Sequence, residues 1–306
     1  MEQQEPDVTI AKSNHSLIPW LGDRRGYLSD WITQRWVETT GIRIDLDEQP
    51  WLRGPMGKSA KIGAGYFADL AREEGLEIAT DSSRVGLIPN LSVLASPTCN
   101  TGGISPAVID FYEHTSSYNM DVSGKWCGPF GPFGAILALI FWRRLQQFNI
   151  PLTSADTASG ITSQVVQLLN KDTGEVAYTA WIRELVANHN VMYAGSYSTC
   201  DVPYHPGQCV KLVFPLPNGN AVVLLKPESN AGGLLTLSSS GGRFGCPGLY
   251  FVVRNAKGVV SAKYVRAMCE KINVWAEATD EVSADHVFKV WGITFLRLHY
   301  RLTRKL

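Results

Sequence analysis

Residues 211–226 are central to the fold, because they read Lys211-Leu-Val-Phe-Pro-Leu-Pro217, then Asn218-Gly219, then Asn220-Ala-Val-Val-Leu-Leu-Lys226. Two apolar runs on either side of Asn-Gly are the strongest short-range signal for a β-hairpin, since both turn residues accept the positive φ that a type I′ turn requires. The stretch therefore predicts two antiparallel strands joined by a two-residue turn at Asn218 and Gly219.

Other strand-like runs extend this hairpin into a long antiparallel meander. Turn-rich segments at 170–174 and 255–258 separate some of the runs. The predicted strands are 161–169, 175–185, 191–200, 234–238, 249–254, 259–266, 271–278 and 288–302. So many short strands predict a closed barrel or a strongly curved sheet, because closure removes exposed edges. For the last run, a helix over 285–302 is the alternative, since Trp291, Phe295 and Leu298 also fit helical spacing.

Composition limits the class of protein. The chain has 306 residues, of which 45% are hydrophobic and 18% charged, and its 28 basic and 28 acidic residues balance. This balance gives no basic surface typical of nucleic-acid binding. The six cysteines form no Cys-x-x-Cys pair, and the first residues are polar rather than a signal peptide. These features predict a cytoplasmic protein with reduced thiols.

The first part of the chain predicts three helices. The first two span about 30–39 and 60–74, with Ser29 and Ser59 as N-caps and glycines 41 and 75 as stops. The third begins at Ser105, with Pro106 in its first turn. Residues 85–95 are apolar and could be extended, and residues 96–104 are turn-rich.

A fourth helix is predicted after a repeated Gly-Pro-Phe motif at 128–133. It begins near Pro132 and is apolar on all sides as far as Trp142, which is typical of a helix buried in a core or in lipid. A membrane span needs roughly 20 such residues, so we expect a buried core helix, with an interfacial or ligand-covering helix as the alternative.

Three short motifs resemble catalytic or nucleotide sites but lack a required feature. Gly57-Lys58-Ser59 has Leu52 where a phosphate-binding loop needs glycine. Ser105 is followed by Pro106, which has no N–H for an oxyanion hole. The glycine-rich loop at 240–248 lies between strands, which is not the context of a dinucleotide site. The six histidines have no metal-ligand spacing, so no metal or cofactor is predicted.

The densest group of titratable residues lies between Asp110 and Asp121. Asp110 and His114 are four residues apart on one helix and can touch, which would orient the imidazole for proton transfer. The proton-transfer candidates are Tyr112, Glu113, His114 and Asp121. The alternative is a surface ion pair on an amphipathic helix. If the helix instead turns Phe111 and Tyr112 inward, Tyr112 becomes the better acid and His114 faces solvent.

Aromatic and basic residues near this group are candidates for contacting a ligand. Arg143 is the predicted partner of an anionic group. Arg297 and His299 lie on one face of the last run, which is either an outward basic strip or a polar barrel interior. The predicted ligand-binding residues are Trp126, Phe130, Phe133, Arg143, Arg297 and His299.

The whole pattern predicts an α+β protein with an N-terminal helical layer packed on a C-terminal antiparallel barrel or strongly curved sheet. Segments 1–104, 105–159 and 160–306 are expected to form one integrated domain. The meander with preceding helices is similar in outline to calycin-like or helix-grip folds, and this resemblance implies ligand binding.

Three functions are expected from this pattern. The first is a cofactor-independent acid–base enzyme, such as a cyclase, isomerase or dehydratase, acting on a bulky apolar polyketide, terpenoid or lipid. The second is a non-catalytic carrier of such a ligand, and the third is a partner-binding structural protein. The expected partner is an apolar small molecule, with no nucleic acid and no transmembrane span.

Overall fold

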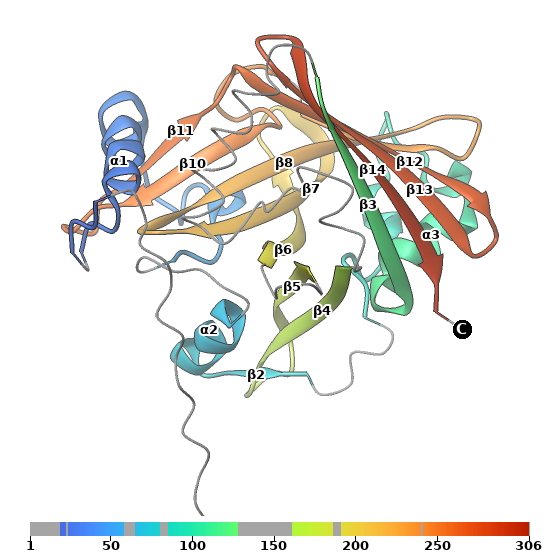
Figure 1. Ribbon diagram of the computed structural model, residues 1–306, viewed down its shortest axis with the longest axis horizontal. Helices are drawn as coiled ribbons and strands as arrows, with labels where there is room; N and C mark the ends of the chain where they lie inside the picture. Colours follow the sequence, from blue (N-terminus) through green and yellow to red (C-terminus); the bar gives the residue numbers. More distant parts are fainter. Residues whose placement is uncertain are drawn as a thin grey trace, which may run out of the picture.

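The computed structural model describes residues 19–22, 24–57, 65–79, 85–127, 161–185, 191–239 and 241–305. Strands account for 52% of the chain (Figure 1). The α-helices of the described residues are α1 (Leu28–Thr40), α2 (Tyr66–Glu74) and α3 (Pro106–Glu113). The strands are β1 (Ile42–Ile44), β2 (Leu76–Ile78), β3 (Tyr118–Trp126), β4 (Ile161–Asn170), β5 (Val176–Leu185), β6 (Val191–Val202), β7 (His205–Leu216), β8 (Gly219–Ser229), β9 (Leu235–Ser238), β10 (Leu249–Arg254), β11 (Val260–Tyr264), β12 (Met268–Ala278), β13 (Glu281–Val290) and β14 (Ile293–Arg304).

All these strands belong to one antiparallel sheet, whose main order is β2-β4-β5-β6-β7-β8-β9-β12-β13-β14-β3. The sheet divides at β8. The first half of β8 pairs with β10, which leads to β11 and β1. The second half of β8, from Lys226 to Ser229, pairs with β9. The strand β8 therefore joins two arms, and the larger arm, which ends at β3, curls back until β3 contacts β4 (Figure 1).

The predicted fold class was wrong. Among the described residues, three α-helices accompany a sheet of fourteen strands, so no N-terminal helical layer covers a barrel. The sheet is also not closed, because β3 pairs with β14 but shares no ladder with β4. The segment predicted to be helical, 105–159, supplies the edge strand β3. Its sequence alternates buried Tyr118, Met120 and Val122 with exposed polar residues, which is the two-residue period of a half-buried strand.

The main hydrophobic core defines what we call the inner face of the sheet. It contains Trp181 of β5, Val223 of β8, Val274 of β12 and Leu302 of β14, packed with Phe111 of α3. On the opposite, outer face, α2 covers β4, β5 and β6 through Phe67 and Leu70, and the 3₁₀ turn Pro50–Leu52 covers β7 and β8. Alternate residues of one strand therefore lie in different cores, which fixes the register of the central strands.

The predicted turn lies one residue earlier than Asn218-Gly219. Leu216 pairs with Gly219, so the two loop residues are Pro217 and Asn218. Asn218 has φ of 58°, and proline holds its own φ near about −65°, which together give the backbone of a type II turn. Gly219 belongs to β8 and lies against β10, where a Cβ would overlap the carbonyl oxygen of Val252. This glycine is needed for close approach of two strands rather than for turn geometry.

The last run was also predicted incorrectly, because 288–302 is not a single element. Strands β13 and β14 pair along their length, and only Trp291 and Gly292 separate Val290 from Ile293. Both turn residues have positive φ, 48° for Trp291 and 80° for Gly292. This backbone region costs a residue with a side chain about 1–2 kcal/mol, so tryptophan is an unusual choice there. The helix considered for 285–302 was wrong as well.

The predicted helices agree better with the structure. Gly41 ends α1, Gly75 ends α2 with φ of 68°, and Ser105 precedes Pro106 at the start of α3. The starts of two helices differ. Tyr27 is the N-cap of α1, and its backbone N–H donates to Asp30. Gly65, rather than the predicted Ser59, is the N-cap of α2. The apolar helix predicted at 135–142 lies outside the described residues.

We expect a loss of stability in alkali from the cross-strand pair Cys200 and Cys209 on β6 and β7. Burial raises the pKa of Cys200 from 9.0 to about 11 and raises that of Cys209 as well. Since the unfolded chain then loses these protons first, the free energy of unfolding falls as the pH rises from 9 to 11, by about 2 kcal/mol or more. Urea unfolding at pH 8 and pH 11 measures this loss. The double variant Cys200→Ala, Cys209→Ala should lose less, and an equal loss in both proteins would contradict the assignment.

Candidate functional site

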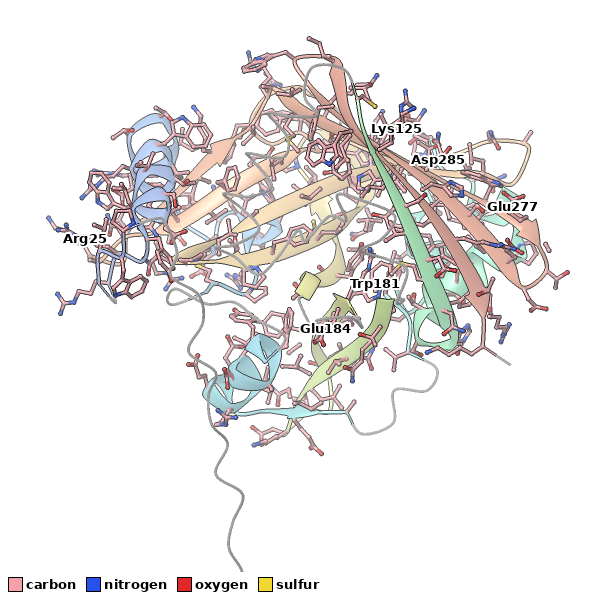
Figure 2. The ribbon with its side chains drawn as sticks, viewed as in Figure 1. Arg25, Lys125, Trp181, Glu184, Glu277 and Asp285 are labelled. Carbon is pink, nitrogen blue, oxygen red and sulfur yellow. The ribbon has the colours of Figure 1, made fainter. Side chains whose placement is uncertain are left out.

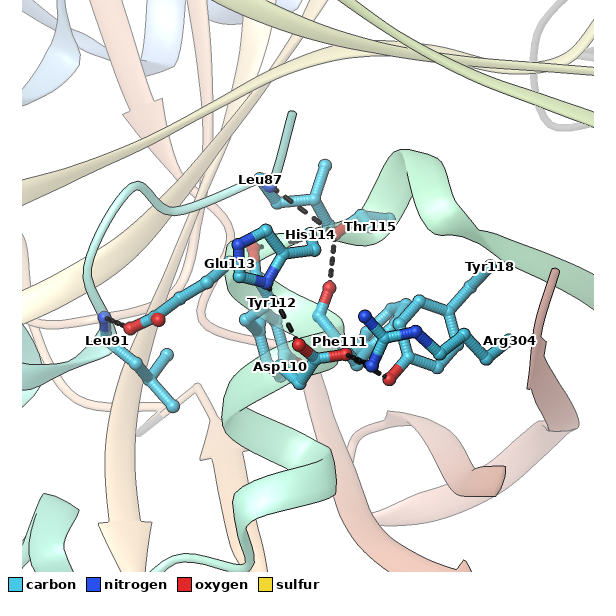
Figure 3. Close-up of polar contacts among 10 residues, drawn as sticks. All are labelled: Leu87, Leu91, Asp110, Phe111, Tyr112, Glu113, His114, Thr115, Tyr118 and Arg304. Carbon is cyan, nitrogen blue, oxygen red and sulfur yellow. Dashed lines mark hydrogen bonds and ion pairs between the residues drawn. The ribbon is translucent and has the colours of Figure 1, made fainter. Parts of the chain in front are cut away.

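Asp110 of α3 is a structural junction between three segments of the chain. Its Oδ1 lies 3.0 Å from Nδ1 of His114. Its Oδ2 accepts hydrogen bonds from the Tyr118 hydroxyl at 2.7 Å and from the Arg304 guanidinium at 2.9 Å (Figure 3). The carboxylate therefore connects α3 to the first residue of β3 and to the end of β14.

His114 lies at the surface end of this network. The contact with Asp110 that the four-residue spacing predicts is present, and 39% of the His114 side chain is exposed. Neighbouring Glu113 turns away and accepts a hydrogen bond from the backbone N–H of Leu91 at 2.7 Å (Figure 3). The two residues therefore face different surroundings, and the role of His114 in proton transfer stays a prediction.

Helix α3 turns Phe111 and Tyr112 into the main core, which is the second orientation considered from the sequence. Tyr112 is 5% exposed. Burial raises the pKa of its hydroxyl well above its ordinary value, Tyr197 adds to this rise, and the nearby charge of Arg183 opposes it. Tyr112 is therefore a neutral hydrogen-bonding group close to a buried cation.

Arg183 is the most unusual side chain on the inner face. It lies on β5 two residues after Trp181 and is 8% exposed. The Cζ atom of its guanidinium lies 3.5 Å from the centroid of the Trp181 ring and 5.5 Å from that of Tyr300. Figure 2 labels Trp181 in the middle of the molecule. A cation among aromatic rings gains cation–π attraction, but it is costly to remove from water unless polar groups surround it.

Tyr300 supplies one of these polar groups. Burial raises the pKa of its hydroxyl, whereas the charge of Arg183 and a hydrogen bond with it act in the opposite direction. Trp181 is also held in place, because its Nε1 donates to Ser163 at 2.8 Å and its ring meets Tyr197 edge to face at 5.6 Å. The surroundings of Arg183 thus combine hydroxyl groups with apolar ring surfaces.

A part-buried acid–base pair lies next to Tyr300. Nε2 of His286 is 2.7 Å from Oε2 of Glu270, and only 11% and 12% of these side chains are exposed. The His286 ring stacks on Phe288 with a centroid distance of 3.8 Å and lies 6.5 Å from the Tyr300 ring. We call Tyr112, Arg183, Tyr197, Glu270, His286 and Tyr300 the inner polar cluster.

Most of the candidate residues predicted from the sequence do not converge. Asp121, Arg297 and His299 are exposed on the outer face, where His299 contacts Asp285 at 2.8 Å. Trp126 is half-buried on the inner face at the far end of β3, with Phe295 6.3 Å away. Phe130, Phe133 and Arg143 lie outside the described residues. Of the predicted residues, Tyr112 alone joins the inner polar cluster.

Sequence reasoning missed Arg183, Glu270, His286 and Tyr300. A usable signal was present, because each lies two residues from an inner-face residue: Trp181, Ile272, Ala284 and Leu302 respectively. Strand alternation therefore places all four on the inner face. In the part of the chain that the structure describes, no group of three or more histidine, cysteine, aspartate or glutamate side chains could hold a metal ion.

Comparison with known proteins gives a distant relative but no family. No family model matches the chain, and no solved structure matches it. The chain is 26% identical over 246 residues to the uncharacterized membrane protein YndJ of Bacillus subtilis (strain 168). The match covers 79% of this chain and 41% of that protein, so the chain spans less than half of its relative.

This likeness corrects two expectations. The predicted cytoplasmic location is contradicted, because the relative is named a membrane protein. The described helices themselves are all too short or too polar to cross a bilayer. The predicted cyclase or isomerase built on a β-barrel is not retained either, because the sheet is open and none of the comparisons points to such an enzyme.

Proposed function

We propose that the chain binds an apolar small molecule that carries one anionic or carbonyl group, and that Arg183 recognises this group. The observation that carries the proposal is a guanidinium 8% exposed on the inner face, stacked 3.5 Å from the Trp181 ring. A guanidinium offers five N–H donors in a planar arrangement that suits a carboxylate. Ligand sites typically combine mostly apolar walls with a few convergent polar groups.

The neighbours of Arg183 fit this role. The hydroxyls of Tyr112 and Tyr300 remain protonated at neutral pH, because burial raises their pKa values, and so they can donate to an oxygen atom. Phe288 and Ile272 lie half-buried on the same inner face and provide apolar surface for the rest of the molecule.

Binding of a fluorescent polyene carboxylate tests the proposal. Parinaric acid should bind the parent chain about 10–100-fold more tightly than its methyl ester, because hydrogen bonds to charged groups contribute about 1.5–3 kcal/mol. Arg183→Met should remove this preference, and Arg183→Lys should keep part of it. The matched control is Arg72→Met, which changes an arginine of α2 whose side chain is 77% exposed.

Equal binding of acid and ester by the parent chain would overturn the assignment, as would an unchanged preference in Arg183→Met. Urea unfolding of each variant should accompany the titration, because a change in folding alone would weaken both probes equally. Mass spectrometry of an organic extract of the purified chain gives a second result, and a co-purifying carboxylate or carbonyl compound is expected.

Proton transfer to or from the bound molecule is a second candidate, favoured by the contact between Glu270 and His286 at 2.7 Å. Both side chains lie on the inner face next to Tyr300, so their hydrogen-bonded pair could act on the same ligand. Glu270→Gln and His286→Asn should then lower turnover of the extracted compound by about 10²–10⁴-fold with little change in its binding. A fall in binding alone would leave the pair as a recognition group.

A further inference from the structure

The turn between β13 and β14 exposes an apolar tip that folding alone does not explain. Trp291 is 80% exposed and Ile293 is 57% exposed. Trp291 also adopts φ of 48°, a region that residues with a side chain seldom enter, at a position where asparagine or glycine is the usual residue. A large apolar side chain held in a strained conformation and facing water points to a role outside the fold.

The tip is held in a fixed place. The backbone N–H of Trp291 donates to the carbonyl oxygen of Ala267 at 2.8 Å, which fastens it to the turn between β11 and β12. The β13–β14 turn and the β11–β12 turn therefore lie side by side, at the end of the sheet opposite the C-terminus (Figure 1). The exposed Arg266 belongs to the second of these turns.

Basic side chains gather just behind the tip. Arg266, Lys289, Arg297 and Lys125 are all exposed, and Arg297 and Lys125 are direct cross-strand partners on the outer face of β14 and β3. Successive cross-strand pairs extend this row of residues across the sheet. Arg297 pairs with Val287, and Val287 pairs with Lys271. Lys271 and Lys226 both pair with Ser238. Lys226, Lys271 and Lys289 line a hollow of about 320 Å³ on this face, where Lys226 is also paired with Glu228 at 2.9 Å.

Along β3, β12, β13 and β14, basic side chains lie near the tip and outward-facing carboxylates lie farther from it. The segments 264–269, 287–297 and 124–127 around the tip contain four arginines or lysines and no carboxylate. The carboxylates of β3, β12 and β13 that face outward lie farther from the tip, at Asp121, Glu277, Glu281 and Asp285. Figure 2 shows Lys125 on the tip side of Asp285 and Glu277. Such a separation orients a protein with its basic end toward a negative surface.

We propose that this tip docks the chain onto an anionic lipid surface, with Trp291 and Ile293 entering the headgroup region and the four basic side chains contacting lipid phosphates. Tryptophan is enriched at membrane–water interfaces because its ring is amphipathic. Nearby lysines and arginines add attraction to anionic lipid within a Debye length of the surface. Apolar and basic groups at one end of the molecule together supply the two contributions on which interfacial binding depends.

Sedimentation with vesicles tests the proposal through Trp291→Asn. Asparagine suits positive φ, so this variant should unfold at an equal or higher urea concentration than the parent. Its partitioning onto vesicles of phosphatidylcholine mixed with phosphatidylglycerol should nevertheless fall several-fold. Ile293→Asn should lower partitioning too, whereas the control Ile32→Asn on α1, where the side chain is 54% exposed, should not.

Removal of two basic side chains tests the electrostatic contribution to binding. The double variant Lys125→Gln, Arg297→Gln should bind anionic vesicles about 25-fold more weakly, from about five-fold for each cation removed. Arg254→Gln with Lys257→Gln changes two exposed cations where β10 turns into β11, away from the tip. This double variant is the matched control and should bind as the parent does. Binding of the parent should also weaken as salt is added.

Three results would overturn the proposal. The first is that the parent binds neutral and anionic vesicles equally, or binds neither. The second is that Trp291→Asn partitions onto vesicles as the parent does. Sedimentation velocity could instead show a parental dimer that Trp291→Asn dissociates without any dependence on vesicles, which would make the tip a contact between two copies.

Discussion

Replacing Gly219 with alanine is expected to lower the free energy of unfolding by at least about 3 kcal/mol, which is in the range of the large single-residue effects. The added Cβ would overlap the carbonyl oxygen of Val252 and come within 3.1 Å of the Val253 Cα, so β8 and β10 would have to separate. These contacts are with backbone atoms, which cannot rotate away as a flexible side chain can. Urea unfolding followed by circular dichroism measures the loss.

Gly65→Ala is the matched control, because no atom of the described residues lies within 4 Å of a Cβ added there and its φ is −74°. That variant should be neutral or more stable by up to about 1 kcal/mol, because alanine restricts the unfolded chain. Asn218→Gly should also be tolerated, since glycine accepts the φ of 58°. A Gly219→Ala protein as stable as the parent would show that β8 and β10 are not closely apposed at this point.

Asp110→Ala is expected to cost about 3 kcal/mol, because one carboxylate accepts from Tyr118 and Arg304 and contacts His114. The Tyr118 hydroxyl belongs to a residue only 2% exposed, and leaving a buried donor without its acceptor costs about 1–3 kcal/mol. Losing the charged acceptor for Arg304 adds a smaller amount, since that side chain is 46% exposed. Urea unfolding again provides the measurement.

Asp121→Ala makes the same chemical change at an exposed position of β3. It should alter the free energy of unfolding by less than about 0.5 kcal/mol. Asp110→Asn should fall between the two, because an amide oxygen still accepts from Tyr118 but carries no charge for Arg304. Equal stability of Asp110→Ala and the parent would contradict a structural role for the network. The His114→Ala variant then separates stability from function, since its ring is partly exposed and can be removed at little structural cost.

The strands of the meander were predictable where alternation and turn residues agreed. The turn at 170–174 and the ranges of β4, β5, β9 and β10 match the sequence pattern to within two residues. The turn in Pro217-Asn218-Gly219 was predicted one residue too late, because this segment contains two overlapping turn signals. Pro-Asn suits a type II turn and Asn-Gly suits type I′, and only the approach of β10 to Gly219 decides between them. That contact is between residues far apart in the chain.

Two elements were missed for a different reason. The turn at Trp291 and Gly292 has little sequence signal, because tryptophan rarely adopts positive φ. The predicted run 288–302 therefore crosses this turn, and residues 281–287 of β13 were not predicted to form a strand. The alternation in β3 was visible, but residues 110–121 were interpreted as one chemical group. The change from α3 to β3 separates them: Tyr112 enters the core, whereas Asp121 faces solvent on a strand.

The inner polar cluster could not be assembled from local patterns alone. Arg183, Glu270 and Tyr300 are separated by up to 117 positions, and they come together only because β5 and the strands β12 to β14 face the same core. Alternation predicts the face of each residue but not which strands lie opposite one another. The order of the strands in the sheet supplies that missing relation.

The division of the sheet at β8 has a consequence for how the molecule opens. Residues 219–223 of β8 pair with both β7 and β10, whereas residues 226–229 pair with β9, so each arm can separate from β8 without the other. Amide hydrogen exchange should therefore report two independent opening units, the β10-β11-β1 arm and the β9-β12-β13-β14-β3 arm. The amides of β7 and β8 should exchange last, and only when the whole chain unfolds.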